Sequence, residues 1–114
     1  MTLLMILKLV AAGVTMAVGA ISLIWPKKGA SFTGLPVDSP RGTSEIRAIL
    51  GGLFIGLGLA VLLFRSPGAY RTLGTGYLAI AAARGFSIFA DDASTGSNWI
   101  SLASEVVLGV LLVL

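Results

Sequence analysis

The best candidates for chemistry in this sequence are four charged residues that stand inside long apolar stretches or at their edges. Arg84 and Glu105 each lie within such a stretch, while Glu45 and Arg47 stand at the start of another. A lone charge in hydrocarbon costs at least about 2.5 kcal/mol, so each of these side chains needs a partner. An arginine fork can bind a carboxylate through two hydrogen bonds, which predicts an ion pair between Arg84 and Glu105.

The positions of these charges along the chain support the pairing. Arg84 lies six residues before the end of a predicted third span at Ala90, and Glu105 lies seven residues after the start of a fourth at Asn98. Because the two spans are antiparallel and joined by a short turn, we expect both charges at one depth, about 9–10 Å inside the membrane. Glu45 or Arg47 is expected to turn inward and join them in one polar cluster. The supporting hydrogen-bonding residues are Tyr77, Ser87 and Ser101.

Three kinds of role fit such a cluster. It can be a buried clamp that holds the helices together, since ion pairs in apolar surroundings can specify an arrangement. It can bind the polar group of a lipophilic or lipid-like molecule, or a partner protein. The alternative is a dimeric proton- or ion-coupled transporter or channel, in which Glu105 takes up and releases the proton. An enzyme is the least favoured reading, because histidine and cysteine are both absent and no metal-ligand cluster or phosphate-binding loop is present. The sequence predicts no cofactor and no metal site.

The elements that position these charges follow from composition. The chain has 114 residues, of which 56% are hydrophobic and only 11% are charged, and its mean hydropathy is +0.99. Soluble domains carry about 25% charged residues, so much of this surface faces something other than water. The apolar residues form four long blocks, which predict an all-α integral membrane bundle of one domain. The predicted spans are 3–25, 45–64, 72–90 and 98–114, joined by loops 26–44, 65–71 and 91–97.

The predicted boundaries rest on local signals. Prolines and glycines interrupt residues 26–44, so this loop is expected to lack regular structure. Thr43 or Ser44 is expected to cap the second span, and Pro67-Gly68 to form the turn before the third. A cleaved signal peptide is an alternative reading of the first span, disfavoured because no basic segment precedes it.

Four spans place both termini on one side of the bilayer. Trp25 and Trp99 then fall at one interface and Tyr70 at the other, as an aromatic belt requires. Basic residues are nearly balanced between the two sides, and Lys8 is expected to extend towards the terminus side. We expect the termini in the cytoplasm and the protein in an inner membrane, with dual topology as the alternative. The lipid bilayer is the predicted partner, and no basic run indicates nucleic acid.

The second span also carries a stripe of small residues. Ala48, Gly52, Gly56 and Ala60 repeat every four residues and so share one helix face. Small residues let helix backbones approach closely in lipid. The expected role is packing inside the bundle, and the alternative is a homodimer seam.

One combination of motifs resembles a known family. Glu45-Ile46-Arg47 leads into Gly51-Gly52, with Arg84 in the third span and Glu105 in the fourth. This pattern resembles an uncharacterised family of small bacterial four-helix inner-membrane proteins, loosely related to the DoxX-like proteins. The resemblance implies the four-helix fold and a bacterial inner membrane, and no established activity. Small multidrug-resistance transporters are similar in size, but they carry a glutamate in the first span, where this chain has only Lys8. Fluoride channels resemble this chain in size, and dual topology is typical of them, but their motif is not found in this sequence.

Overall fold

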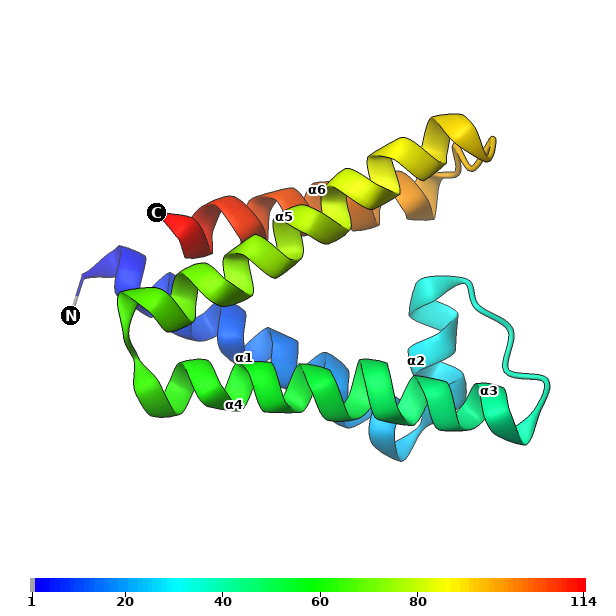
Figure 1. Ribbon diagram of the computed structural model, residues 1–114, viewed down its shortest axis with the longest axis horizontal. Helices are drawn as coiled ribbons and strands as arrows, with labels where there is room; N and C mark the ends of the chain where they lie inside the picture. Colours follow the sequence, from blue (N-terminus) through cyan, green and yellow to red (C-terminus); the bar gives the residue numbers. More distant parts are fainter. Residues whose placement is uncertain (1) are drawn as a thin grey trace. The chain divides into compact units, whose positions relative to one another are not determined.

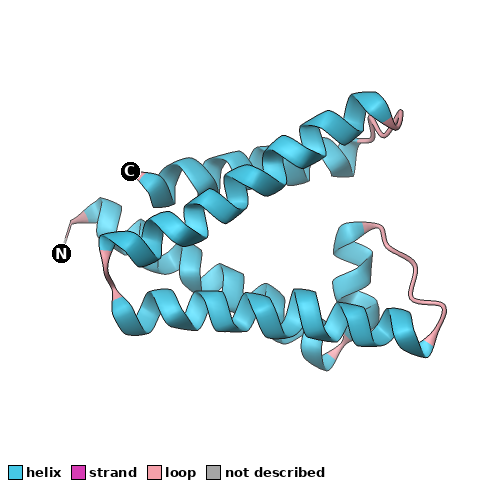
Figure 2. Ribbon diagram, viewed as in Figure 1, coloured by secondary structure: helices cyan, strands magenta, loops and turns pink. Residues whose placement is uncertain are grey.

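The structure, a computed structural model, describes residues 2–114, and all regular structure in that range is helical (Figures 1 and 2). Four helices are long and apolar enough to cross a bilayer: Leu3–Ile24, Pro40–Phe64, Pro67–Ala90 and Gly96–Val113. The predicted all-α membrane fold is therefore confirmed. The elements are α1 (Leu3–Ile24), α2 (Pro26–Thr33), α3 (Pro40–Glu45), η1 (Ile46–Leu53), α4 (Phe54–Phe64), α5 (Pro67–Ala90) and α6 (Gly96–Val113).

Three helices begin earlier than predicted, because side-chain caps and prolines lie further upstream. Ser39 accepts a hydrogen bond from the Gly42 amide at 3.0 Å and caps α3, so neither Thr43 nor Ser44 is the cap. Ser66 caps α5 in the same way, and Pro67 begins this helix instead of forming a turn. Proline suits the first helical position because its missing N–H would have no partner there. Thr95 caps α6, which begins at Gly96, two residues before its predicted start.

Residues 26–33 also form a helix, α2, where the sequence predicted an irregular loop. Pro26 stands at its first turn and Gly34 ends it with φ +73°, a backbone conformation that glycine adopts without strain. Gly29 and Ala30 are buried, and a side chain at Gly29 would collide with Ser22 of α1. This close packing on α1 depends on the tertiary structure, which a reading of proline and glycine content does not capture.

The second membrane-spanning helix contains a π-helical segment, η1, which the prediction of a regular helix did not include. Its amides bond to carbonyls five residues back, so the turns are wider than in the α-helix on either side. Gly51 within it is buried, and an added Cβ there would lie 3.0 Å from Leu23 of α1. One of the close approaches of α1 therefore falls on the π-helical segment.

The chain divides into two compact units, and each is described by itself. One comprises Leu9–Phe64. In it, α1 packs on the second membrane-spanning helix through glycines of both. An added Cβ at Gly19 would lie 2.8 Å from the Gly51 carbonyl oxygen, and one at Gly58 would collide with Met16 and Ala12. Because lipid provides no hydrophobic drive between helices, these close backbone contacts are what hold the pair.

The other unit comprises Arg65–Leu114 together with α1 as far as Lys8. Its main feature is the antiparallel hairpin of α5 and α6, joined by residues 91–95 (Figure 1). An added Cβ at Gly74 would lie 3.0 Å from the Gly109 carbonyl oxygen, and one at Gly109 would lie 3.2 Å from the Gly74 carbonyl oxygen. This reciprocal glycine contact brings the two backbones together and fixes the register in which their polar residues meet.

Candidate functional site

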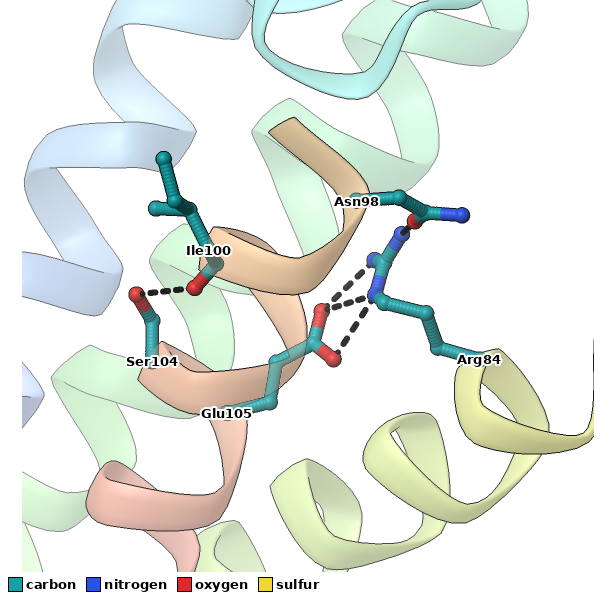
Figure 3. Close-up of polar contacts among 5 residues, drawn as sticks. All are labelled: Arg84, Asn98, Ile100, Ser104 and Glu105. Carbon is teal, nitrogen blue, oxygen red and sulfur yellow. Dashed lines mark hydrogen bonds and ion pairs between the residues drawn. The ribbon is translucent and has the colours of Figure 1, made fainter. Parts of the chain in front are cut away.

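Arg84 of α5 and Glu105 of α6 form an ion pair with several hydrogen bonds (Figure 3). The Arg84 Nε donates to Glu105 Oε2 at 2.8 Å and Oε1 at 2.9 Å, and Nη2 donates to Oε1 at 2.6 Å. The Glu105 side chain is 12% exposed and the Arg84 side chain 27%. Both carboxylate oxygens are bound by the guanidinium, so the two charges neutralise one another within the hairpin.

Asn98 is the third member of the site, and sequence reasoning missed it. Arg84 Nη1 donates to the Asn98 Oδ1 at 2.8 Å (Figure 3). The Asn98 amide is itself oriented, because its Nδ2 donates to the Ala93 carbonyl oxygen at 3.0 Å. The sequence contains a spacing that could have predicted Asn98 as a member of the site. Asn98 and Glu105 are seven residues apart, so they share one face of α6.

The backbone positions of Arg84 and Glu105 lie at different distances from the turn, contrary to the prediction that they are level. Their charged groups meet because the two side chains lean towards each other. Arg84 lies six residues before the end of α5 at Ala90, and Glu105 lies nine residues after the start of α6 at Gly96. At 1.5 Å per residue these positions are about 9 Å and about 14 Å from the turn. Helical side chains tilt towards the helix N-terminus. In this antiparallel pair Arg84 therefore leans away from the turn and Glu105 leans towards it.

A shallow cavity of about 310 Å³, largely open to the outside of the hairpin, lies beside the pair and is lined by Ile80, Ala83, Arg84, Ser87 and Asn98. A guanidinium has five N–H donors. Nε–H, one Nη1–H and one Nη2–H are engaged in the bonds described above. Two N–H groups of Arg84 take no part in these bonds.

The whole chain matches one family model. The model describes a domain of unknown function, DUF4345, and the match covers residues 3–114. The chain belongs to the DUF4345 family. This confirms the predicted membership of an uncharacterised family. No curated protein and no solved structure matches the chain.

The other two predicted cluster residues of this DUF4345 protein lie in the unit formed by residues 9–64. Glu45 forms an ion pair with Arg41, whose Nε lies 3.2 Å from Glu45 Oε1, and both side chains are largely exposed. Arg47 is exposed at the start of η1. Glu45 thus has a partner one helical turn away that the sequence analysis did not consider, and the four-residue cluster stays a prediction.

The three residues predicted to support the cluster, Tyr77, Ser87 and Ser101, differ from one another in their surroundings in the α5–α6 hairpin. Ser87 lines the cavity, but its hydroxyl donates to Asp91 Oδ2 at 2.6 Å. Tyr77 is buried in α5, and Ser101 is half-buried in α6. The direct contacts with Arg84 are made by Glu105 and Asn98.

The small-residue stripe faces outward in its own unit. Ala48, Gly52 and Gly56 are exposed, Ala60 is half-buried, and a Cβ added at Gly56 would meet no atom within 4 Å. Gly51 and Gly58, which are not part of this stripe, make the contacts with α1. The homodimer seam therefore stays a prediction that this exposed face permits.

Proposed function

We propose that this protein is a non-enzymatic, multi-pass membrane protein that binds a lipid-like amphiphile with the α5–α6 hairpin. The observation that carries the proposal is the cavity of about 310 Å³ against Arg84, a residue with donors left over after its bonds to Glu105 and Asn98. Ligand sites typically have volumes of about 300–1,000 Å³ and combine apolar walls with a few polar groups.

The depth of the site favours an amphiphile. α5 has 24 residues and is about 36 Å long, so each end extends about 3 Å beyond a hydrocarbon core of about 30 Å. Arg84 then lies about 6 Å inside the core, given its distance of about 9 Å from the helix end. This is the region just below the headgroups, where the ester and hydroxyl groups of lipid-like molecules meet their chains.

The charge of the site favours a neutral acceptor. Arg84 and Glu105 cancel one another, so an anionic ligand would meet no net positive charge there. A carbonyl, ester or hydroxyl oxygen needs only a hydrogen-bond donor, and the remaining N–H groups of Arg84 supply one. Ile80 and Ala83 provide apolar contact for the adjoining chain.

Native mass spectrometry of the protein released from nanodiscs made of natural lipid extract tests the proposal. Ala83→Leu fills the cavity and leaves the ion pair intact, and Ala82→Leu, the adjacent exposed residue outside the cavity lining, is the matched control. We expect wild type and Ala82→Leu to retain the same bound amphiphile, and Ala83→Leu to lose it. Equal retention by all three proteins would show that the amphiphile does not bind in this cavity and would contradict the proposal.

The alternative, a dimeric transporter or channel with Glu105 as the titrating group, is supported by the exposed face of Ala48, Gly52 and Gly56, which leaves room for a second copy. Such a cycle requires Glu105 to leave Arg84. Proton-coupled uptake into proteoliposomes that is lost in Glu105→Gln would favour this alternative.

A further inference from the structure

The short helix α2 lies where α1 leaves the membrane. α1 has 22 residues and is about 33 Å long, so it ends close to the edge of a hydrocarbon core of about 30 Å. α2 begins at Pro26, two residues after the last residue of α1, and its eight residues are too few to cross a bilayer. Its buried residue Gly29 packs against Ser22 of α1. This contact holds α2 at the membrane–water interface.

The outer face of α2 carries two aromatic rings and a lysine between them. Trp25, Lys28 and Phe32 are spaced three and four residues apart, so they share one side of the helix and its N-cap. Trp25 is 53% exposed and Phe32 is 57% exposed. Lys28 Nζ lies 5.2 Å from the centroid of the Trp25 ring, which brings the ammonium and the aromatic surface together. Aromatic residues beside lysines are typical of helices that lie in the interface.

The charges of Lys27 and Lys28 are not compensated within the chain. Both lysines are exposed in the first turn of α2, which has no acidic residue, and cations at this end of a helix oppose its dipole. Among residues 2–114, neither lysine forms an ion pair with a carboxylate. Helix stability therefore does not account for two lysines at this position, whereas an anion from outside the chain would meet both ammonium groups.

We propose that the outer face of α2 binds an anionic phospholipid, with Lys27 and Lys28 at its phosphate and Trp25 and Phe32 against its glycerol and upper acyl chains. Lysines next to a membrane attract anionic lipid, and amphipathic rings lie at the level of the headgroups. A lipid fits this face because it offers an anion and an apolar chain side by side, whereas a dissolved anion would leave both rings uncovered. The site uses only residues of the unit 9–64, and it does not rest on the proposed amphiphile cavity.

Trp25 itself is the probe for the test. The chain has two tryptophans, so Trp99→Phe leaves Trp25 as the only one. The protein is placed in nanodiscs of equimolar phosphatidylglycerol and phosphatidylcholine, with brominated acyl chains in one of the two lipids at a time. The two quenching efficiencies give the local ratio of phosphatidylglycerol to phosphatidylcholine at Trp25. We expect this ratio to exceed that of the bulk lipid, Lys28→Gln to lower it about fivefold, the factor that corresponds to one cation, and Lys28→Arg to keep it.

Two matched controls separate this site from general effects of charge. Arg71→Gln removes one exposed cation of α5, as Lys28→Gln does from α2, and should leave the lipid ratio at Trp25 unchanged. Trp25→Phe leaves Trp99 as the only tryptophan, and Trp99 should show no preference for phosphatidylglycerol.

The other outcomes overturn the proposal. Equal quenching of Trp25 by the two brominated lipids would show that α2 does not select the anionic headgroup. Absence of quenching by either lipid would place Trp25 outside the bilayer. An equal loss of preference in Arg71→Gln, or an equal preference at Trp99, would mean that the total charge of the protein attracts the lipid and that α2 is not a site.

Discussion

Replacing Glu105 with glutamine removes the charge opposite Arg84 at almost no change in shape. Removing one partner of a buried ion pair costs about 3–5 kcal/mol, because the other charge is left without compensation. Arg84 would keep Asn98, and its side chain is 27% exposed. The glutamine carbonyl would still accept one hydrogen bond. We therefore expect Glu105→Gln to lower the free energy of unfolding by about 3 kcal/mol, the lower end of this range. This corresponds to an equilibrium constant for unfolding that is raised about 100-fold.

The double variant Arg84→Leu/Glu105→Leu distinguishes the cost of leaving one charge unpaired from the contribution of the ion pair itself. It leaves no unpaired charge, and replacing a buried ion pair by apolar side chains is often neutral or stabilising. We expect its free energy of unfolding to lie within about 1 kcal/mol of wild type. Glu45→Gln is the matched control, since Glu45 belongs to an exposed pair with Arg41 whose loss should cost less than about 1 kcal/mol.

Trp99 provides the assay. Its ring meets that of Phe89 edge-to-face across the α5–α6 hairpin, with centroids 6.2 Å apart. In a Trp25→Phe background its fluorescence follows separation of the two helices during reversible unfolding in mixed micelles with increasing sodium dodecyl sulfate. A Glu105→Gln variant as stable as wild type would refute the reasoning, as would a double variant as unstable as the single one.

Three further predictions concern packing, topology and assembly. Gly74→Ala should destabilise the hairpin by about 1–3 kcal/mol relative to Gly76→Ala. Both substitutions gain the same helix propensity, but of these two glycines only Gly74 contacts α6. Titration with sodium dodecyl sulfate measures the difference in the free energy of unfolding, and equal values would contradict the prediction. The chain has no cysteine, so a single introduced cysteine reports the side of the membrane on which it lies. Ser66→Cys should react with a membrane-impermeant maleimide only from the cytoplasmic side, and Ser94→Cys only from the opposite side. Labelling of each variant from both sides would indicate dual topology. Gly56→Leu, at an exposed position with open space around it, should preserve folding and reduce chemical cross-linking of two copies, and unchanged cross-linking would rule out the stripe as the seam.

Much of the architecture could be predicted because hydropathy acts locally. A long apolar stretch must satisfy its backbone hydrogen bonds within itself, so length and composition alone identify the four helices. The Arg84–Glu105 pair could be predicted for a related reason, since each charge needs a partner in lipid and a short turn brings their helices together. The sequence reading did not fix the helix starts, because proline and serine occur both in turns and in first helical turns.

The features that escaped prediction depend on which face of a helix meets its neighbour. The regular spacing of Ala48, Gly52 and Gly56 marks a smooth face, but it does not say that α1 packs instead on Gly51 and Gly58. Asn98 was missed because the charged residues were matched by depth, without allowing for the tilt of their side chains. Lys8, which was expected to extend to the interface, is buried, and its Nζ lies 5.4 Å from the centroid of the Tyr70 ring, a contact with a residue distant in sequence.

The bonding of Arg84 to Glu105 within one helical hairpin has a consequence for how the protein enters its membrane. Inserted one at a time, α5 would carry an arginine and α6 a glutamate into lipid, at a cost of about 2.5–3.5 kcal/mol for a charge near the centre of a helix. Only a short turn, residues 91–95, separates the two helices, so the second emerges from the ribosome soon after the first. We expect α5 to stay at the translocon until α6 is made, so that both enter the bilayer as a hairpin in which Arg84 and Glu105 are already paired.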